Sequence, residues 1–384
     1  MKVAFSAIGA YGHVFPMLPL AMAFRDAGHE VVMATAEPFL GTLPLRTVAT
    51  YDPSLTLEWA VGETRRRHPD LHDDELSIAM FADVTADASI PVTIEVLTSE
   101  QPDLVIGEPL HVGALIAASL LGIPAAAFSI GLTPSFYPLV HGAAVGYHRH
   151  RWVERGLVPP ERALLADVLV DPCPPSLRAP YDDAPCVPIR TVAWRGAATG
   201  AVPGWLEQPA TTPRVYLTLG TVSFGAVEVL RRTALEIAAL DAELLIAVGP
   251  EGDPSLLGDL PPQVRCERFV DQAAVLRQVD LIVHHGGTGT VLAALEVGLP
   301  QVILPQGADQ PFNADLIQRA GAGRSQSNDD YTAGSISQLV GPLLGPCPER
   351  EVARRIADEI ATMPAPPDVV PSLVARVAGR AREA

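Results

Sequence analysis

Short apolar segments alternate with stretches of helical periodicity, and this alternation runs through the first half of the chain and begins again in the second. The pattern predicts strands at residues 2–7, 31–35, 103–107 and 125–129, and again at 214–219, 243–248, 281–284 and 302–304. Strands and helices that alternate in this way form parallel sheets with helices on both faces. The predicted fold class is therefore α/β, with two doubly wound Rossmann-like domains that face a central cleft.

The chain of 384 residues is too long for one ordinary hydrophobic core, and its prolines indicate where it divides. They are dense from residue 172 to 213, a composition that suits an extended connector. We therefore predict an N-terminal domain at 1–195, a linker at 196–212 and a C-terminal domain at 213–364. A helix at 365–384 is expected to pack back onto the first domain.

Residues 51–90 interrupt the pattern with a polar and charged stretch. The simpler interpretation is a solvated surface loop. The alternative is a mobile flap over a ligand pocket, because long loops in compact α/β domains are often functional. Both interpretations predict little regular structure in this stretch.

Acidic residues outnumber basic ones by 44 to 27, which gives a formal net charge of −17. A field of this sign repels polyphosphate backbones and anionic membranes, so nucleic-acid binding is not expected. The four cysteines show neither a CxxC pair nor a metal-ligand spacing with histidine, which argues against a zinc site and a disulfide framework. With no apolar leader and no uninterrupted apolar run of about 18 residues, we expect a cytoplasmic protein without membrane insertion. Assembly as a homodimer is left open.

A glycine-rich stretch, Val283-His-His-Gly-Gly-Thr-Gly-Thr290, lies between a predicted strand and a predicted helix that closes at Gly298. Glycines let a backbone approach a ligand closely, and the free N–H groups at a helix N-terminus attract anions. The His285 imidazole and the Thr290 hydroxyl can add hydrogen bonds to phosphate oxygens. The stretch therefore predicts a diphosphate site, with an ordinary structural turn as the alternative.

Three further segments accompany this stretch in order along the chain: Phe269-Val-Asp-Gln272, Gly298-Leu-Pro300 and Pro305-Gln-Gly-Ala-Asp-Gln310. With them the sequence resembles the nucleotide-sugar glycosyltransferases of the GT-B fold, especially bacterial enzymes that glycosylate antibiotics and other natural products. The resemblance covers nearly the whole chain. It implies transfer of a sugar or deoxysugar from a dTDP- or UDP-sugar to a small apolar acceptor, such as a polyketide, aromatic or macrolide-like aglycone.

The resemblance also implies which residues bind the donor. Val270 would meet the base through its backbone, and Gln272 would lie near the ribose. Asp309 and Gln310 would bind sugar hydroxyls, although a helix N-cap is an alternative role for Asp309. The other donor-binding residues implied by the family are Gly12, Gly220, Thr221, His285, Gly287, Thr288, Gly289 and Thr290.

Two departures from plant members of the family bear on the donor. Phe269 stands where those members carry Trp, and Ala293 stands where they carry a Glu that binds ribose hydroxyls. A deoxyribose donor tolerates the loss of that Glu. The absence of that Glu therefore favours dTDP-sugars over UDP-sugars.

The segment Gly12-His-Val-Phe-Pro16 matches the family's Gly-His-x-x-Pro element, whose histidine is the general base. An imidazole with an ordinary pKa of about 6.5 is largely free to accept a proton at pH 7. His13 then needs an acidic partner that fixes its tautomer. Glu108, at the end of a predicted strand, is the candidate, and His111 nearby is the alternative.

The implied reaction is a direct displacement at the anomeric carbon with inversion, in which His285, Thr290 and helix N–H groups hold the developing diphosphate charge. Such stabilisation can replace a metal, and the chain has no Asp-x-Asp motif, so neither a metal nor another cofactor is expected.

The acceptor is not identified by the sequence. Trp59, Phe136, Tyr137 and His141 are candidates to line an apolar acceptor pocket, with ordinary packing as the alternative. Two other functions are also weighed: a nucleotide-sugar epimerase or hydrolase of the same fold, and a non-catalytic partner that activates a glycosyltransferase.

Overall fold

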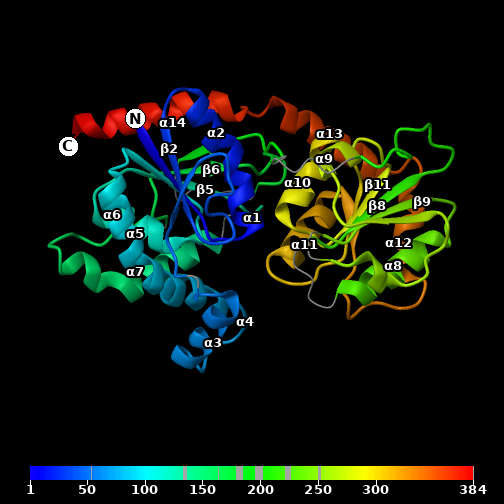
Figure 1. The fold of residues 1–384 in the computed structure, drawn as a ribbon, viewed down its shortest axis with the longest axis horizontal. Coiled ribbons are helices and arrows are strands. Elements are labelled where there is room, and N and C mark those ends of the chain that lie inside the picture. Colours follow the sequence, from blue (N-terminus) through cyan, green and yellow to red (C-terminus); the bar gives the residue numbers. More distant parts are fainter. Residues whose placement is uncertain are drawn as a thin grey trace. The chain divides into compact units, whose positions relative to one another are not determined.

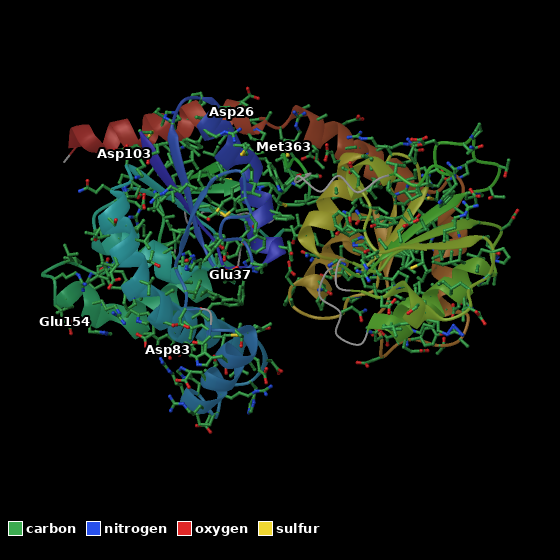
Figure 2. All side chains as sticks on the ribbon, viewed as in Figure 1. Asp26, Glu37, Asp83, Asp103, Glu154 and Met363 are labelled. Carbon is green, nitrogen blue, oxygen red and sulfur yellow. The ribbon has the colours of Figure 1, made fainter. Side chains whose placement is uncertain are left out.

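The computed structural model describes residues 1–52, 54–132, 136–162, 164–178, 185–194, 202–220, 226–249 and 252–383. The chain divides into two compact units. Unit 1 comprises Met1–Cys173, Arg178–Val192 and Pro364–Ala384, and unit 2 comprises Pro174–Leu177 and Ala193–Met363. Each unit is built around one sheet with helices packed on it (Figure 1), and Figure 2 labels Met363, the last residue of unit 2.

The sheet of unit 1 is parallel, with the strand order β3-β2-β1-β4-β5-β6-β7. Because β2 and β4 lie on opposite sides of β1, the sheet has a switch point between β1 and β4, where open α/β sheets bind ligands. The strands are β1 (Lys2–Ser6), β2 (Glu30–Thr35), β3 (Arg46–Ala49), β4 (Leu104–Gly107), β5 (Ala125–Phe128), β6 (Val168–Asp171) and β7 (Cys186–Pro188).

The sheet of unit 2 repeats this arrangement with the order β10-β9-β8-β11-β12-β13. Its switch point lies between β8 and β11, where Thr218 is in register with His284. The strands are β8 (Arg214–Thr218), β9 (Glu243–Ala247), β10 (Val264–Glu267), β11 (Leu281–His284), β12 (Gln301–Ile303) and β13 (Gly323–Ser325).

The helices of unit 1 cover a core built from apolar strand residues such as Val105 and Ala127 and from α6 residues such as Leu115. The C-terminal helix α14 also belongs to this unit, where it packs against α2. The helices are α1 (Tyr11–Val14), the 3-10 helix η1 (Phe15–Met17), α2 (Leu18–Asp26), α3 (Leu57–Arg67), α4 (Asp73–Ala79), the π-helix η2 (Met80–Thr85), α5 (Ala86–Glu100), α6 (Val112–Leu120), α7 (Phe136–Val153) and α14 (Pro366–Glu383).

The helices of unit 2 enclose a second core around strand residues such as Leu217, Ile246 and Val283. The two helices that matter most for the site begin directly after the carboxyl ends of β11 and β12. The helices are α8 (Ala226–Ala238), the 3-10 helix η3 (Pro254–Leu257), α9 (Gln272–Val275), α10 (Thr288–Glu296), α11 (Gln310–Ala320), α12 (Ser335–Val340), the 3-10 helix η4 (Gly341–Leu343) and α13 (Pro348–Thr362).

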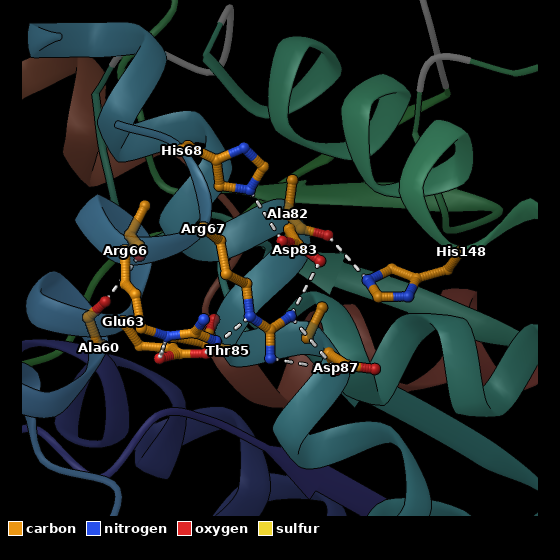
Figure 3. A network of polar contacts seen from close by, with 12 residues as sticks. Ala60, Glu63, Arg66, Arg67, His68, Ala82, Asp83, Thr85, Asp87 and His148 are labelled. Carbon is orange, nitrogen blue, oxygen red and sulfur yellow. Dashed lines mark hydrogen bonds and ion pairs between the residues drawn. The ribbon is translucent and has the colours of Figure 1, made fainter. Parts of the chain in front are cut away.

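The polar stretch at residues 51–90 is mostly helical, so the prediction of little regular structure there is wrong. Some of its charges form ion pairs between α3 and the helices that follow. Arg67 on α3 lies 3.3 Å from Asp87 on α5, and His68 lies 2.8 Å from Asp83 on η2 (Figure 3). These ion pairs accompany the packing of α3 against η2 and offset part of the cost of placing charged side chains at that contact.

One continuous helical run, Asp73–Glu100, is long and apolar enough by length and composition to cross a membrane, with a mean hydropathy of 1.2. It consists of α4, η2 and α5. Ala82, Ala86 and Ile90 on this run are fully buried in the core of unit 1, where the run packs against α6 and α7. Within the apolar window of this run, 39% is buried inside the structure.

The second part of the predicted linker, residues 202–212, packs onto unit 2. Leu206 is buried in the core of that unit. The guanidinium of Arg214, at the start of β8, donates to the carbonyl oxygens of Leu206 and Trp205 at 2.8 and 3.2 Å. This turn is therefore held to the sheet of unit 2 by hydrogen bonds as well as by packing.

Candidate active site

His13 and Glu108 meet at the switch point of the unit 1 sheet. His13 lies on α1, just after β1, and Glu108 directly follows β4. The Nδ1 atom of His13 is 3.0 Å from Oε1 of Glu108. The side chain of His13 is 23% exposed, whereas that of Glu108 is fully buried. The structure thus brings together the residues predicted as the base and its acidic partner.

The carboxylate of Glu108 receives hydrogen bonds on both oxygens. The backbone N–H of Ile8 donates to Oε1 at 3.4 Å, and that of Leu110 donates to Oε2 at 2.7 Å. Burial opposes ionisation, but the imidazoles of His13 and His111 and the Leu110 N–H keep the pKa of Glu108 below its usual range. An ionised Glu108 accepts from Nδ1–H of His13, which assigns the proton-accepting role to Nε2.

His111, the alternative partner of His13, has a different environment. Its Nδ1 lies 2.8 Å from Oγ of Ser6, and its ring stacks on Tyr51 with centroids 4.8 Å apart. Burial lowers the pKa of His111 to about 4, so its ring is neutral at pH 7. Glu108 is the residue that accepts from Nδ1 of His13.

Two of the predicted acceptor residues belong to the core of unit 1, which corrects their assignment. His141 is fully buried; its Nε2 donates to the carbonyl of Pro109 at 2.8 Å, and its Nδ1 accepts from the N–H of Leu165 at 2.9 Å. Tyr137 is 3% exposed, and its hydroxyl accepts from the N–H of Gly131 at 3.0 Å. Because their polar atoms bind inside the unit, neither side chain lines an accessible pocket.

The other two acceptor candidates keep part of their surface exposed. Phe136 begins α7 and is partly buried against the core cluster of unit 1. Trp59 is half-buried in the first turn of α3, where its backbone N–H donates to the N-cap Thr56 at 3.1 Å. Both residues remain predicted acceptor contacts.

The glycine-rich turn of unit 2 is shaped from the inside by His284, the last residue of β11. The N–H of Gly286 donates to Nδ1 of His284 at 3.1 Å, and Nε2 of that ring donates to Oε1 of Gln301 at 2.8 Å. Gly286 has a φ of +95°, and a Cβ there would lie 2.7 Å from Cγ2 of Ile303. Only glycine therefore fits at this point of the turn.

The ring of His285 is enclosed by two other glycines. A Cβ at Gly220 would lie 2.8 Å from Cε1 of His285, and one at Gly287 would lie 2.5 Å from its Nε2. Burial lowers the pKa of His285 to about 4, although the charge of Asp309 opposes the shift, so the ring is neutral at pH 7. Its Nδ1 is buried without a hydrogen-bond partner among the residues that the structure describes. A buried polar atom of this kind is suited to a ligand.

The first turn of α10 is open at its N-terminal end. Gly287 occupies the N-cap position and makes no side-chain cap. In the described part of the chain, a Cβ at Gly289 would meet nothing within 4 Å. The Thr288 hydroxyl donates inward to Asp309 at 2.9 Å, while Thr290 is half-exposed. The turn therefore presents backbone N–H groups and the Thr290 hydroxyl to an anion.

Asp309 stands at the N-cap position of α11, but its side chain makes no capping bond. Its Oδ2 accepts instead from Oγ1 of Thr288 at 2.9 Å and from Nδ2 of Asn313 at 3.0 Å. The Oε1 atom of Gln310 accepts from the backbone N–H of Gln306 at 2.7 Å. Both predicted sugar-binding side chains thus also organise the loop before α11.

The predicted base-binding segment leads into α9, which begins at Gln272. The side chain of Val270 is buried, yet within the described ranges its backbone N–H and carbonyl make no hydrogen bond. Phe269 beside it is 52% exposed. A free backbone edge next to an exposed ring is suited to a nucleobase. Thr221, predicted for the donor site, lies outside the described residues.

Sequence reasoning missed Asn313 and gave Phe269 no role. Asn313 is fully buried and bonds to both Thr288 and Asp309. A signal for Asn313 was present, because it lies one helical turn after Asp309 and residues four apart share a helix face. The signal for Phe269 was an aromatic residue just before the base-binding segment.

The sequence matches one protein family in both halves. Residues 22–220 match the erythromycin biosynthesis protein CIII-like N-terminal domain, and residues 231–376 match the corresponding C-terminal domain. An L-demethylnoviosyl transferase from Streptomyces niveus is 36% identical over 98% of each chain.

Solved structures agree with this match. Glycosyltransferase SsfS6 of Streptomyces sp. SF2575, complexed with thymidine diphosphate, aligns with a TM-score of 0.79 at 28% identity, over 97% of this chain and 99% of that one. Spinosyn rhamnosyltransferase SpnG, complexed with spinosyn aglycone, aligns with a TM-score of 0.80 at 26% identity, over 97% of this chain and 100% of that one. The predicted fold of two Rossmann-like domains is confirmed. The chain therefore belongs to the erythromycin biosynthesis protein CIII-like family, and it is a natural-product glycosyltransferase of the GT-B fold.

Proposed function

We propose that this enzyme transfers a deoxysugar from a dTDP-sugar to a small, largely apolar aglycone of antibiotic-type secondary metabolism, with inversion at the anomeric carbon. The observation that carries the proposal is the pair of His13 and Glu108, whose Nδ1 and Oε1 atoms lie 3.0 Å apart. In this scheme unit 1 holds the acceptor, because it contains the base, and unit 2 holds the donor.

His13 acts as the general base. Glu108 accepts from Nδ1–H, so Nε2 takes the proton of the acceptor as the acceptor attacks the anomeric carbon. The imidazolium that forms is stabilised by a carboxylate that is fully buried, where its field is weakly screened. Direct attack opposite the leaving diphosphate inverts the anomeric carbon.

The start of α10 stabilises the diphosphate as it leaves. Backbone N–H groups of the open first turn and the Thr290 hydroxyl donate to the diphosphate oxygens, and the His285 ring lies against Gly287 at the start of this turn. Among the residues that the structure describes, no group of three or more His, Cys, Asp or Glu side chains is placed to hold a metal ion. We therefore propose that protein donors, not a divalent cation, carry the charge stabilisation.

The donor is proposed to carry thymidine. SsfS6 was solved with thymidine diphosphate, as was a second structural neighbour, VinC. In this chain Ala293 packs against the core cluster that contains Val270, and its methyl group offers no acceptor for a ribose hydroxyl. A deoxyribose, which lacks the 2′-hydroxyl, loses less at such a site than a ribose does.

The acceptor is proposed to be an aglycone because SpnG was solved with spinosyn aglycone, and relatives bear the names 10-deoxymethynolide desosaminyltransferase and aclacinomycin-T 2-deoxy-L-fucose transferase. The two alternative functions fit less well. A non-catalytic activator needs no base, and an epimerase or hydrolase would need its own acid and base near the donor and no acceptor pocket.

The test is a donor panel of dTDP- and UDP-sugars offered with polyketide and aromatic aglycones, followed by mass spectrometry before and after exhaustive chelation. We expect glycosylated product from a dTDP-sugar, undiminished by chelation, and tighter calorimetric binding of dTDP than of UDP. Equal or reversed affinities would overturn the donor assignment. Activity that disappears on chelation and returns with magnesium or manganese would overturn the metal-free scheme.

A further inference from the structure

Asn313 connects three separate parts of the donor site. Its Nδ2 donates to the carbonyl of Gly286 at 2.9 Å, to Oγ1 of Thr288 at 3.1 Å and to Oδ2 of Asp309 at 3.0 Å. Gly286 belongs to the turn after β11, Thr288 begins α10, and Asp309 precedes α11. One buried amide therefore holds the phosphate-side turn and the sugar-side carboxylate in a single arrangement.

The three polar groups form a closed ring of hydrogen bonds. The Thr288 hydroxyl accepts a hydrogen bond from Asn313 and donates one to Oδ2 of Asp309 at 2.9 Å. Oδ2 therefore accepts two hydrogen bonds, one from Thr288 and one from Asn313. The other oxygen of Asp309, Oδ1, has no hydrogen-bond partner in the described part of the chain, and the residue is exposed. Asp309 is thus fixed through one oxygen and offers the other.

The Nδ2 atom of Asn313 is fully used in these contacts, whereas the side-chain carbonyl oxygen is not. Its Oδ1 is buried and lacks a hydrogen-bond partner among the described residues. The Nδ2 atom of Asn313 carries two hydrogens but faces three acceptors, so one N–H is shared between two of them. Such an arrangement is not what packing alone selects, because a buried acceptor without a partner destabilises the fold.

We propose that Asn313 is a positioning residue for the donor sugar. It binds the Asp309 carboxylate against the start of α10, so that Oδ1 is preset to accept from a sugar hydroxyl while the diphosphate occupies the turn beside it. The inference rests on the proposed function, since it requires that unit 2 binds a nucleoside diphosphate sugar. It adds a residue that acts through Asp309 without touching the donor.

The experiment compares calorimetric dissociation constants for dTDP and dTDP-glucose in wild type, Asn313→Ala, Asp309→Ala and the double variant. The readout is the ratio of the two constants, because a general loss of folding changes both ligands alike. We expect each single variant to weaken dTDP-glucose relative to dTDP by about tenfold, in line with a lost bond to a charged group. The double variant should be no worse than Asp309→Ala alone, because both changes remove one function.

A second variant and a matched control keep the result clear. Thr288→Val removes the hydroxyl from the ring at nearly constant volume and should shift the ratio in the same direction, even if Asn313→Ala fails to fold. Gln263→Ala removes a side-chain amide that donates to the carbonyl of Ala238 at 2.8 Å, outside the segments predicted to bind the donor, and should leave the ratio unchanged.

The outcomes separate the inference from the function on which it rests. Wild-type protein that does not bind dTDP overturns the proposed donor and this inference together. Normal dTDP binding with an unchanged ratio in Asn313→Ala and Thr288→Val, or in Asp309→Ala, overturns the positioning role alone. Additive losses in the double variant do the same, since they would mean that the two residues act separately.

Discussion

Glu108 is a buried carboxylate that contacts His13 at the switch point of the unit 1 sheet. It is fully removed from solvent, yet its pKa stays below the usual range because His13, His111 and a backbone donor favour its charged form. The buried Glu108 carboxylate is stabilised further when His13, its imidazole partner, becomes a cation. The geometry at His13 is therefore prepared for the protonated state that a general base reaches during transfer.

Substitutions of His13 and His285 are expected to affect different quantities, the rate of transfer and the affinity for dTDP. His13→Ala should lower the single-turnover rate by about 10²- to 10⁴-fold with little change in dTDP affinity, because general-base catalysis acts on the chemical step. His285→Ala should weaken dTDP binding by about 1.5 to 3 kcal/mol, the range for a hydrogen bond to a charged group.

Rapid-quench transfer assays and calorimetry measure the two quantities, and His150→Ala, an exposed histidine on α7, serves as the matched control. Transfer at the wild-type rate by His13→Ala across a range of pH would show that another group is the base.

Pattern matching from the sequence located residues whose spacing reflects a backbone requirement, and it failed for residues whose role depends on distant packing. His285 and Glu108 follow strands, so their positions were predictable from local sequence. The burial of Tyr137 and His141 depends on how α7 packs on residues far away in the chain, such as Pro109 and Leu165. No local pattern contains that information.

At the scale of elements, α3 is held by charges and not by a broad apolar face. Arg67 reaches the carboxylates of Asp83 and Asp87 at 3.4 and 3.3 Å, and His68 reaches Asp83 at 2.8 Å (Figure 3). These groups are partly exposed, so each contact contributes modestly. Their number explains why a polar sequence nevertheless forms a packed helix.

Asp83→Asn should loosen α3 without unfolding unit 1. The change removes the charge that pairs with both His68 and Arg67, and we expect about 1 kcal/mol, or roughly fivefold, easier local opening. Hydrogen exchange of the amides in Leu57–Arg67 measures this directly. Asp26→Asn, which breaks the exposed pair with Arg25, is the control. Equal protection of α3 in both variants would contradict the role of the network.

The burial of each strand and helix explains which elements could be predicted from the sequence. Apolar strands such as β1, β4 and β11 were anticipated within a few residues, because buried parallel strands are continuous apolar runs. Edge strands such as β3 and β13 were missed, since Arg46–Ala49 and Gly323–Ser325 are short and only partly buried. The helix Leu57–Arg67 was missed because charge pairing with neighbouring helices leaves no apolar periodicity in its sequence.

At the scale of the whole molecule, buried histidines link stability to pH. Burial lowers the pKa values of His111 and His141 to about 4 and that of His284 to about 3. An unfolded chain takes up these protons at a pH of about 6.5. The folded state therefore has its full stability above that pH and loses stability as the pH falls from about 6.5 towards 4.

His141→Gln should flatten this dependence. Removing one such group should reduce the slope of the unfolding free energy by about 1.4 kcal/mol per pH unit between pH 5.5 and 4.5. Urea unfolding at several pH values measures the slope, and His150→Gln, at an exposed position, is the control. A slope identical to that of the wild type would show that His141 is charged in the folded state.

The chain begins and ends in unit 1, because α14 returns to pack on α2 after unit 2 is complete. In genetic terms unit 2 is an insertion within a host domain. An exchange of unit 2 between relatives therefore needs two junctions, one near Val192 and one near Met363, and the C-terminal helix must be kept with unit 1. A chimera with a single crossover would pair α2 of one parent with α14 of the other, and its apolar contact would be mismatched even if both halves were intact.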